Sequence, residues 1–295
     1  MKPLLSYYFY TLDDFYRYCD TLAAENGPAN GSLPLPEIVY LPALPVILRC
    51  FFNDDRRETE RFESAAASLK AISPKTKQIF SLPYIMRGNA LAALKEHFSS
   101  LSRTADGYLL QNIGDLPIIK ELESSVKSEP KLLLGDYALN ITNSLSAAYW
   151  SEKLYSAAIL PELPLSERFA LAAAYPETLV PEIMADDNVI VMRSEHCYAA
   201  PLSGFHCGGC GKDGTQAAGL TDERGRHYPL LCDPLDCNCA LLSPRAGDKK
   251  ITQKVVTEAR QKYYNEAEKF TAQYHRPVLL RYSFYAQEKV KNKGE

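Results

Sequence analysis

Short apolar runs alternate along the chain with longer stretches whose apolar residues recur at helical spacing. The apolar runs predict strands at residues 4–10, 38–41, 78–85, 107–111, 131–134, 157–160, 189–192 and 278–284. The helical spacing predicts helices at residues 13–25, 58–72, 89–102, 116–126, 145–155, 166–174 and 252–274. Strands that alternate with helices are typical of parallel sheets. The pattern therefore predicts an α/β fold, a TIM-type (β/α)8 barrel, with an open doubly wound sheet as the alternative.

The length and composition fit this fold class. A chain of 295 residues suits one barrel domain over residues 1–295. The hydrophobic share of 46% and charged share of 23% are those of a globular protein, and they exclude a disordered chain or a coiled coil. A net charge of −3 argues against a surface that coats nucleic acid. No glycine-rich dinucleotide or phosphate loop is found, so nucleotide cofactors have no support.

The sequence also bears on location. No apolar run approaches the roughly 18 residues that a membrane helix needs, so no membrane partner is expected. The first residues lack the apolar stretch and small-residue cleavage site of a signal peptide. We therefore expect a cytoplasmic protein in a reducing compartment.

The cysteines are distributed very unevenly. Of the eight, Cys19 and Cys50 stand alone, and the other six fall between residues 197 and 239. In a chain without an export signal, such clustering favours metal or cluster ligation over disulfides. The cysteine-rich region, about residues 194–245, is expected as an insertion after the seventh strand, built on a hairpin over residues 220–231 with its turn near residues 223–225.

The spacing of these cysteines fits two kinds of metal centre. Cys207-Gly-Gly-Cys210 resembles a zinc knuckle, and Cys232 and Cys237 would complete a four-thiolate zinc ribbon. An iron–sulfur cluster also takes four thiolates, with less regular spacing. Spacing alone leaves zinc and a cluster as open alternatives.

Polar residues near the ends of the predicted strands are candidates for the barrel mouth, where (β/α)8 enzymes carry their sites. We expect catalytic roles for Asp136, Glu162 and His196. The expected substrate-binding residues are Arg87, Asn112, Asn140, Asn143 and Arg193. Amides, acids and arginines together suit an oxygen-rich anionic small molecule or the edge of a nucleic-acid base.

Each of these residues also has a structural interpretation. Asn140 and Asn143 are suited to capping the following helix, and Asp136 to an Asx turn. Glu162 and Arg193 could pair with each other. His196 precedes Cys197 and could hydrogen-bond to a metal ligand rather than bind the metal.

Several motifs, in order, resemble the U32 peptidase-like family. They are SLPYIMR at 81–87, LQNIGDL at 110–116, LGDYALNITNS at 134–144, LPE at 160–162, VMRSEHC at 191–197 and TDERGRHYP at 221–229. The resemblance covers roughly residues 80–240, and the motif at 134–144 is the most specific. The chain resembles a divergent member of this family, because Asn238 follows Cys237 where members often carry an arginine.

The resemblance implies an eight-stranded barrel that carries an oxygen-sensitive [4Fe–4S] cluster. The cysteines that match the family ligands are Cys197, Cys207, Cys210 and Cys237. Cys232 and Cys239 compete with Cys237 for the last place. The implied cofactor is the cluster, with zinc as the alternative.

Two activities are associated with the family. Its label is collagenase-like peptidase, a hydrolase, whereas other relatives take part in oxygen-independent hydroxylation of RNA bases or ubiquinone precursors. The sequence contains no HExxH or GxSxG motif. The expectation is therefore an iron–sulfur protein that supports hydroxylation of an RNA base or small aromatic precursor, with a partner subunit or electron donor. The alternatives are a peptidase and a zinc-stabilised binding module without catalysis.

Overall fold

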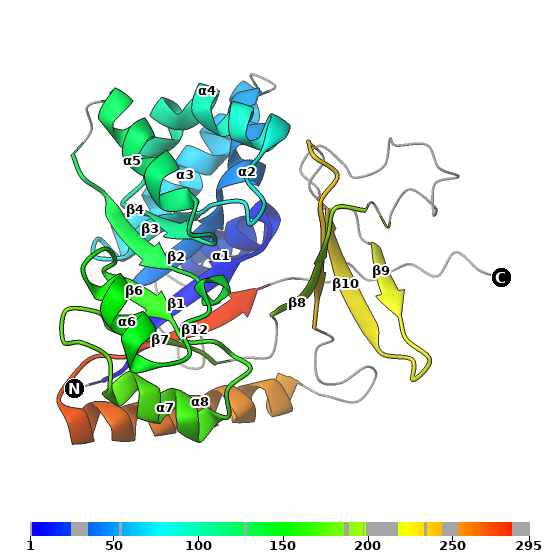
Figure 1. The fold of residues 1–295 in the computed structure, drawn as a ribbon. Helices are drawn as coiled ribbons and strands as arrows, with labels where there is room; N and C mark the ends of the chain where they lie inside the picture. Colours follow the sequence, from blue (N-terminus) through cyan, green and yellow to red (C-terminus); the bar gives the residue numbers. More distant parts are fainter. Residues whose placement is uncertain are drawn as a thin grey trace.

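The computed structural model describes residues 2–24, 35–52, 55–126, 129–185, 189–196, 198, 218–232, 235–243 and 253–284. Its main body is a closed barrel of eight parallel strands with helices outside, so the predicted (β/α)8 fold is confirmed (Figure 1). The strands are β1 (Leu4–Phe9), β2 (Ile38–Pro42), β3 (Lys77–Ser81), β4 (Gly107–Leu110), β5 (Leu132–Gly135), β6 (Ser156–Ala158), β7 (Val180–Met184) and β12 (Leu279–Phe284). Pairing of β1 with β12 closes the ring and leaves this sheet without an edge.

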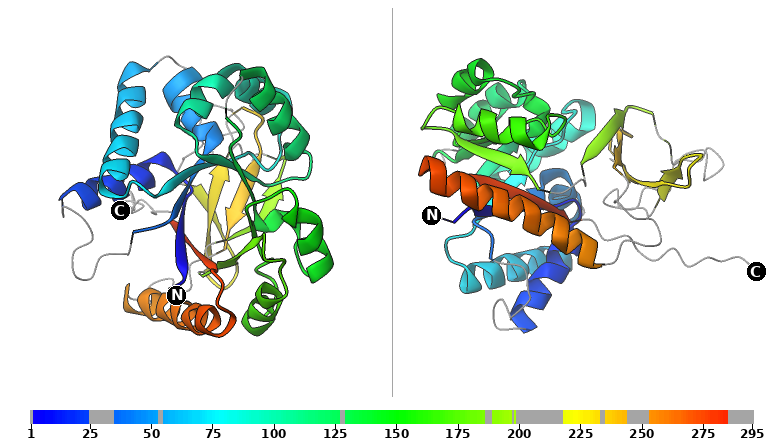
Figure 2. Two further views of the ribbon diagram at one scale, coloured as in Figure 1. Left: turned by 90° about the vertical axis from the view of Figure 1, so that its left-hand side faces the viewer. Right: turned by 90° about the horizontal axis from the view of Figure 1, so that it is seen from below.

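The helices cover the outside of the barrel (Figure 2). They are α1 (Leu12–Ala24), α2 (Ala43–Val46), the π-helix η1 (Ile47–Phe52), α3 (Arg56–Ile72), α4 (Gly88–Thr104), α5 (Asp115–Val126), the 3-10 helix η2 (Tyr137–Leu139), α6 (Ser144–Ser151), α7 (Leu165–Ala173) and α8 (Gln253–Tyr274). Each of the seven predicted helices corresponds to an observed one. Within the described ranges, no helix combines the length and apolar character needed to cross a bilayer.

One predicted barrel strand is wrong. Residues 189–192 were expected as the seventh strand, but β8 (Ile190–Ser194) belongs to a separate sheet. The seventh barrel strand is β7, which pairs with β6 and β12. Pro181 and the charged Glu182 interrupt its apolar pattern, and this is why the sequence conceals it.

The second sheet is inserted between β7 and α8. Its antiparallel strands follow the order β8, β11 (Cys239–Leu242), β10 (His227–Cys232) and β9 (Ala218–Thr221). The predicted hairpin is confirmed as β9 and β10, and the Gly225 amide donates to the Asp222 carbonyl in its turn. The insertion begins earlier than the predicted residue 194, because it includes β8. We call this four-stranded sheet the roof.

Side chains alternate strictly between the two faces of the barrel wall. On β1, Tyr7 and Phe9 pack outward against the helices, whereas Tyr8 belongs to the cluster inside the barrel. The interior cluster is mostly aliphatic and aromatic, and it includes Tyr40 and Leu134. The barrel is therefore a filled core with room for a ligand only at its ends.

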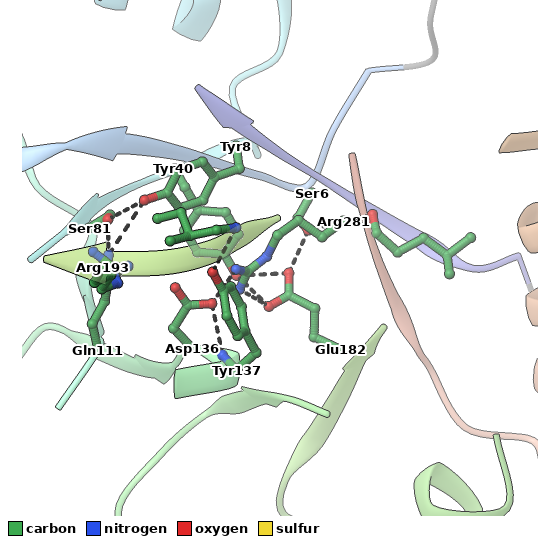
Figure 3. Close-up of polar contacts among 12 residues, drawn as sticks. Ser6, Tyr8, Tyr40, Ser81, Gln111, Asp136, Tyr137, Glu182, Arg193 and Arg281 are labelled. Carbon is green, nitrogen blue, oxygen red and sulfur yellow. Dashed lines mark hydrogen bonds and ion pairs between the residues drawn. The ribbon is translucent and has the colours of Figure 1, made fainter. Parts of the chain in front are cut away.

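A charged group nevertheless lies in the middle of this core. Arg281 on β12 is 1% exposed and forms ion pairs with Asp136, which follows β5, and with Glu182 on β7. Glu182 also accepts hydrogen bonds from the Ser6 hydroxyl (2.5 Å) and the Tyr40 hydroxyl (3.0 Å). The Arg281 guanidinium lies 4.5 Å from the centre of the Tyr40 ring. These contacts join β1, β2, β7, β12 and the end of β5, which lie far apart in the sequence (Figure 3).

A second buried acid shapes the turn after β4. The Asp115 carboxylate accepts hydrogen bonds from the backbone amides of Gln111 (2.8 Å) and Asn112 (2.9 Å). Burial raises the pKa of Asp115 to about 6, and the two backbone hydrogen bonds oppose this shift. The acid of the LQNIGDL motif therefore has a structural role, which is to position Gln111 at the barrel mouth.

Replacing Arg281 with methionine should destabilise the barrel by about 3–5 kcal/mol, because it leaves two carboxylates buried without their cation. Urea denaturation measures the change in the free energy of unfolding. The matched control is Arg103→Met, which removes an exposed arginine and should cost no more than about 0.5 kcal/mol. Equal losses in the two variants would contradict the role given to Arg281.

The raised pKa of Asp115 predicts a pH-dependent difference between the wild type and Asp115→Asn. The native state holds the proton more tightly than the unfolded state, so this contribution is present below pH 3.8 and is lost as the pH rises through about 6. Between pH 4 and pH 7.5, the wild type should lose about 2–3 kcal/mol of unfolding free energy relative to the variant. Urea denaturation at both values tests this, and a difference that does not change with pH would refute it.

Candidate functional site

The roof covers the carboxyl-terminal mouth of the barrel. Ile190, Leu231 and Leu242 of the roof pack with the interior cluster that contains Tyr8 and Tyr10. The barrel strands in Figure 1 run toward the roof, and the roof stands across their ends. The roof therefore packs against the mouth of the barrel.

The turn between β10 and β11 fastens the roof to helix α4. The carboxylate of Asp236 accepts hydrogen bonds from the backbone amides of Asn89 (3.0 Å) and Ala90 (2.8 Å). Arg87, at the N-cap of α4, makes no side-chain capping bond, so Asp236 supplies the cap instead. A Cβ atom at position 88 would lie only 2.8 Å from the Asp236 carboxylate. The φ of 56° at Gly88 is also in the left-handed region, which glycine adopts more readily than other residues.

A pocket of about 160 Å³ lies between the mouth and the roof. Its walls are mainly apolar and aromatic, with a few polar groups. It is lined by Tyr8, Tyr10, Pro42, Ala43, Leu44, Pro45, Leu48, Ser81, Leu82, Pro83, Tyr84, Ile85, Gln111, Ile190, Arg193, Leu231, Cys232, Asn238, Cys239 and Ala240. An apolar cavity with a few fixed polar groups is typical of a small-molecule site.

The polar groups of the pocket form one connected chain. The Arg193 guanidinium donates to Gln111 Oε1 (2.8 Å), and Gln111 Nε2 donates to the Ser81 hydroxyl (2.8 Å). The Ser81 and Tyr8 hydroxyls share a hydrogen bond of 2.7 Å. The Arg193 guanidinium also lies over the Tyr84 ring, 3.9 Å from its centre. Each polar group is thus held in one orientation by its neighbour (Figure 3).

Burial governs the protonation of the groups beneath the pocket. It raises the pKa of the Tyr8 phenol, and the nearby Asp136 carboxylate adds to the shift. Burial likewise raises the pKa of Tyr137, whose hydroxyl accepts a hydrogen bond from the Ile190 amide of the roof (3.2 Å). Burial alone would lower the pKa of Arg281, but its two carboxylate partners raise it well above the usual value. At neutral pH the phenols are therefore uncharged and Arg281 is a cation.

Of the three residues expected to be catalytic, only Asp136 is in the interior. It is 2% exposed, and its carboxylate pairs with Arg281 and accepts a hydrogen bond from the Tyr137 amide. Glu162 and His196 are exposed, and the His196 ring lies edge-on to Tyr198. The structure does not bring these three together. Among the described residues no ion pair joins Glu162 to Arg193.

Of the residues expected to bind substrate, Arg193 alone lines the pocket. The side chains of Asn112 and Asn143 accept hydrogen bonds from the backbone amides of Gly114 and Ser146, so they cap the local turn and helix. Asn140 ends the short helix η2 with a left-handed backbone, at a φ of 55°. Arg87 is exposed and pairs with Glu195 of the roof region.

Only one of the four expected metal ligands is among the described residues. Cys197, Cys207 and Cys210 lie outside the described residues, and Cys237 lies in the turn that precedes β11. Cys232 and Cys239 face each other across β10 and β11, with their sulfur atoms 3.1 Å apart. Within the described ranges, no three metal-ligating side chains gather at one point.

The sulfur pair lies on the outer face of the roof. Cys232 and Cys239 pack with Leu230 and Leu241, whereas Leu231, between Leu230 and Cys232, packs with the barrel interior. Because side chains alternate along a strand, the two thiols point away from the barrel. Both cysteines border the pocket, but their side chains belong to the opposite face.

Sequence reasoning missed several residues of the pocket and of the buried charge network beneath it. Gln111 and Ser81 lie at strand ends, inside two of the quoted motifs, and the rule that sites follow barrel strands could have identified them. Glu182 and Arg281 are charged residues within short apolar strands, and that is the only signal they leave. A charge inside a predicted core strand demands a partner of the opposite charge.

Comparisons with known proteins add only coarse likenesses. No family model and no curated protein matches the chain. Among solved structures, the C-terminal domain of a proposed chitinase from Desulfitobacterium hafniense DCB-2 matches at 10% identity with a TM-score of 0.41, over 95% of this chain and 93% of that one. These values are too low to transfer a function.

Two further solved structures match over less of the chain. A mandelate racemase/muconate lactonizing protein from Herpetosiphon aurantiacus matches at 8% identity, covering 63% of this chain and 48% of that chain. A mandelate racemase/muconate lactonizing enzyme from Roseiflexus sp. matches at 12% identity, covering 63% and 49%. Both TM-scores are 0.35. The chain spans about half the length of these two proteins, and no residue role is taken from them.

The contact between Asp236 and α4 predicts that the variant Asp236→Ala loosens the roof. Loss of a helix cap costs about 1 kcal/mol, and the amides of Asn89 and Ala90 should exchange their hydrogens faster. Hydrogen exchange followed by NMR measures this. Asp222→Ala is the matched control, because Asp222 caps the roof hairpin and does not touch α4. Unchanged exchange in Asp236→Ala would show that the roof is held elsewhere.

Proposed function

We propose that this chain is a U32-like barrel protein that supports oxygen-independent hydroxylation of a small aromatic molecule held in the mouth pocket. The observation that carries the proposal is the pocket itself, with its apolar walls and its connected polar chain from Arg193 to Tyr8. Sites of (β/α)8 enzymes lie at this end of the barrel. The proposal rests otherwise on the motif resemblance.

The size of the pocket favours a small aromatic precursor over an RNA base. A cavity of about 150 Å³ holds a single benzene ring. The present pocket, about 160 Å³, is of that size, and a base with its ribose and phosphate would exceed it. Pockets for larger ligands span about 300–1,000 Å³.

The chain's own residues would bind and orient the substrate. The apolar walls exclude water from the ring, and Arg193 and Gln111 offer fixed polar contacts at one end. Because burial raises the pKa of Tyr8, its phenol keeps its proton and can donate a hydrogen bond to a substrate oxygen. Tyr8 is thus suited to stabilising an oxygen that enters the ring, and unsuited to acting as a base.

The described thiols are chemically suited to a soft metal centre. Thiolates bind both iron–sulfur clusters and zinc, and Cys232 and Cys239 bring two buried sulfurs together next to Cys237. The proposed cluster ligands remain Cys197, Cys207, Cys210 and Cys237, with Cys232 and Cys239 as competitors for the last place. One-electron transfer is the chemistry that such a cluster would supply when bound.

A specific observation favours a second candidate, a zinc-stabilised roof. Two thiolates on one tetrahedral zinc lie about 3.8 Å apart, given Zn–S bonds of about 2.3 Å. The sulfurs of Cys232 and Cys239, at 3.1 Å, need only a small adjustment to reach that spacing. In this case the metal would hold the roof together, and the protein would be a binding module.

Anaerobic purification, with a 300–700 nm spectrum and counts of iron, sulfide and zinc, separates the two candidates. The hydroxylation proposal predicts iron and sulfide together with a broad shoulder near about 400 nm, both lost in Cys197→Ala. Cys19→Ala, at a buried cysteine on helix α1, is the matched control and should keep the full signal. A colourless protein with one zinc, even after attempted cluster reconstitution, would refute the hydroxylation proposal and favour the zinc-stabilised roof.

A further inference from the structure

Arg193 has partners of a different kind from those of the shielded arginines Arg281, Arg49 and Arg168. Arg281 and Arg49 pair with carboxylates, and Arg168 donates to three backbone carbonyls. Arg193 is partly buried, and its contacts are a neutral amide, Gln111, and the Tyr84 ring. No acid pairs with it within the part of the chain that the structure describes. A positive charge without a counter-ion at a pocket wall attracts an anionic ligand.

The guanidinium is also fixed before any ligand arrives. Gln111 holds one nitrogen of Arg193, and the hydrogen bond from Gln111 to Ser81 orients the amide in turn. Tyr84 supports the flat face of the guanidinium at 3.9 Å. An arginine ordered in this way loses little conformational entropy on binding, and its planar fork matches a carboxylate.

The rest of the pocket specifies the body of the ligand. Tyr10, Leu44, Leu48 and Leu231 line it with apolar surface, and its volume of about 160 Å³ suits one six-membered ring. A phosphorylated sugar or a nucleotide would place polar atoms against these walls, which would cost free energy without compensating hydrogen bonds.

We propose that the mouth pocket binds a single-ring aromatic carboxylate, with the carboxylate on Arg193 and the ring between Tyr10 and the roof residue Leu231. The proposal names the substrate class of the function proposed above and rests on it in placing the substrate in this pocket. The specificity-determining group is the Arg193 guanidinium, because it alone among the lining residues carries a charge.

Fluorine NMR titration tests the proposal with 4-fluorobenzoate as the probe and 4-fluorobenzamide as its neutral counterpart. The anaerobically purified protein should bind the benzoate at least tenfold more tightly than the benzamide. Arg193→Met should weaken benzoate binding at least tenfold and leave benzamide binding unchanged, and Arg193→Lys should recover part of the loss. Arg226→Met, which removes an exposed roof arginine paired with Asp222, is the control and should bind like the wild type.

Three readouts decide the outcome. Equal binding of the two probes to the wild type, or unchanged benzoate binding in Arg193→Met, would overturn the proposal. Protection of the Asn89 and Ala90 amides shows whether the roof of each variant is still seated. Iron counted in the same sample separates the two proposals: benzoate binding without iron sustains this inference and refutes the cluster, whereas iron without benzoate binding does the reverse.

Discussion

The Arg281 guanidinium is stable inside the barrel only because two carboxylates pair with it, one within strand β7 and one just after strand β5. Arg281 lies on β12, Glu182 on β7 and Asp136 just after β5, so the three charges fix the relative positions of strands far apart in the sequence. Tyr40 and Ser6 complete the hydrogen bonds of Glu182. A buried charge network of this kind favours one strand register, because any shift would leave a charge without its partner.

This network lies beneath the mouth and sets the floor on which the pocket is built. The Asp136 carboxylate adds to the burial that raises the pKa of Tyr8. Hydrogen bonds through Ser81 and Gln111 then connect Tyr8 to Arg193 of the roof. The roof therefore has two faces to which we assign different functions. Its inner face closes the pocket, and its outer face carries the sulfurs of Cys232 and Cys239. A metal on the outer face could exchange electrons with the pocket across one sheet, but it could not touch a substrate there.

The local spacing of apolar residues predicted most of the fold. The elements that it missed depend on contacts between residues far apart in the sequence. Helical spacing and apolar runs reveal seven helices and seven of the eight barrel strands, because these depend on neighbours in the sequence. Strand β7 was missed because Glu182 looks out of place until Arg281 is beside it. Polar residues after strands were expected to line the mouth. The Asn143 side chain instead accepts a hydrogen bond from the nearby Ser146 amide, because asparagine side chains readily bond to backbone groups close to them in the sequence. Of the residues that the sequence predicted to bind substrate, Arg193 alone lines the pocket.

The most direct test of this two-faced roof is a crystal structure of the anaerobically purified protein, with anomalous scattering measured at the iron and zinc edges. We predict a metal peak in the cysteine-rich region, at Cys237 or beside the sulfur atoms of Cys232 and Cys239, and none inside the pocket bounded by Arg193 and Gln111. A metal peak inside that pocket, within bonding distance of the substrate position, would contradict it.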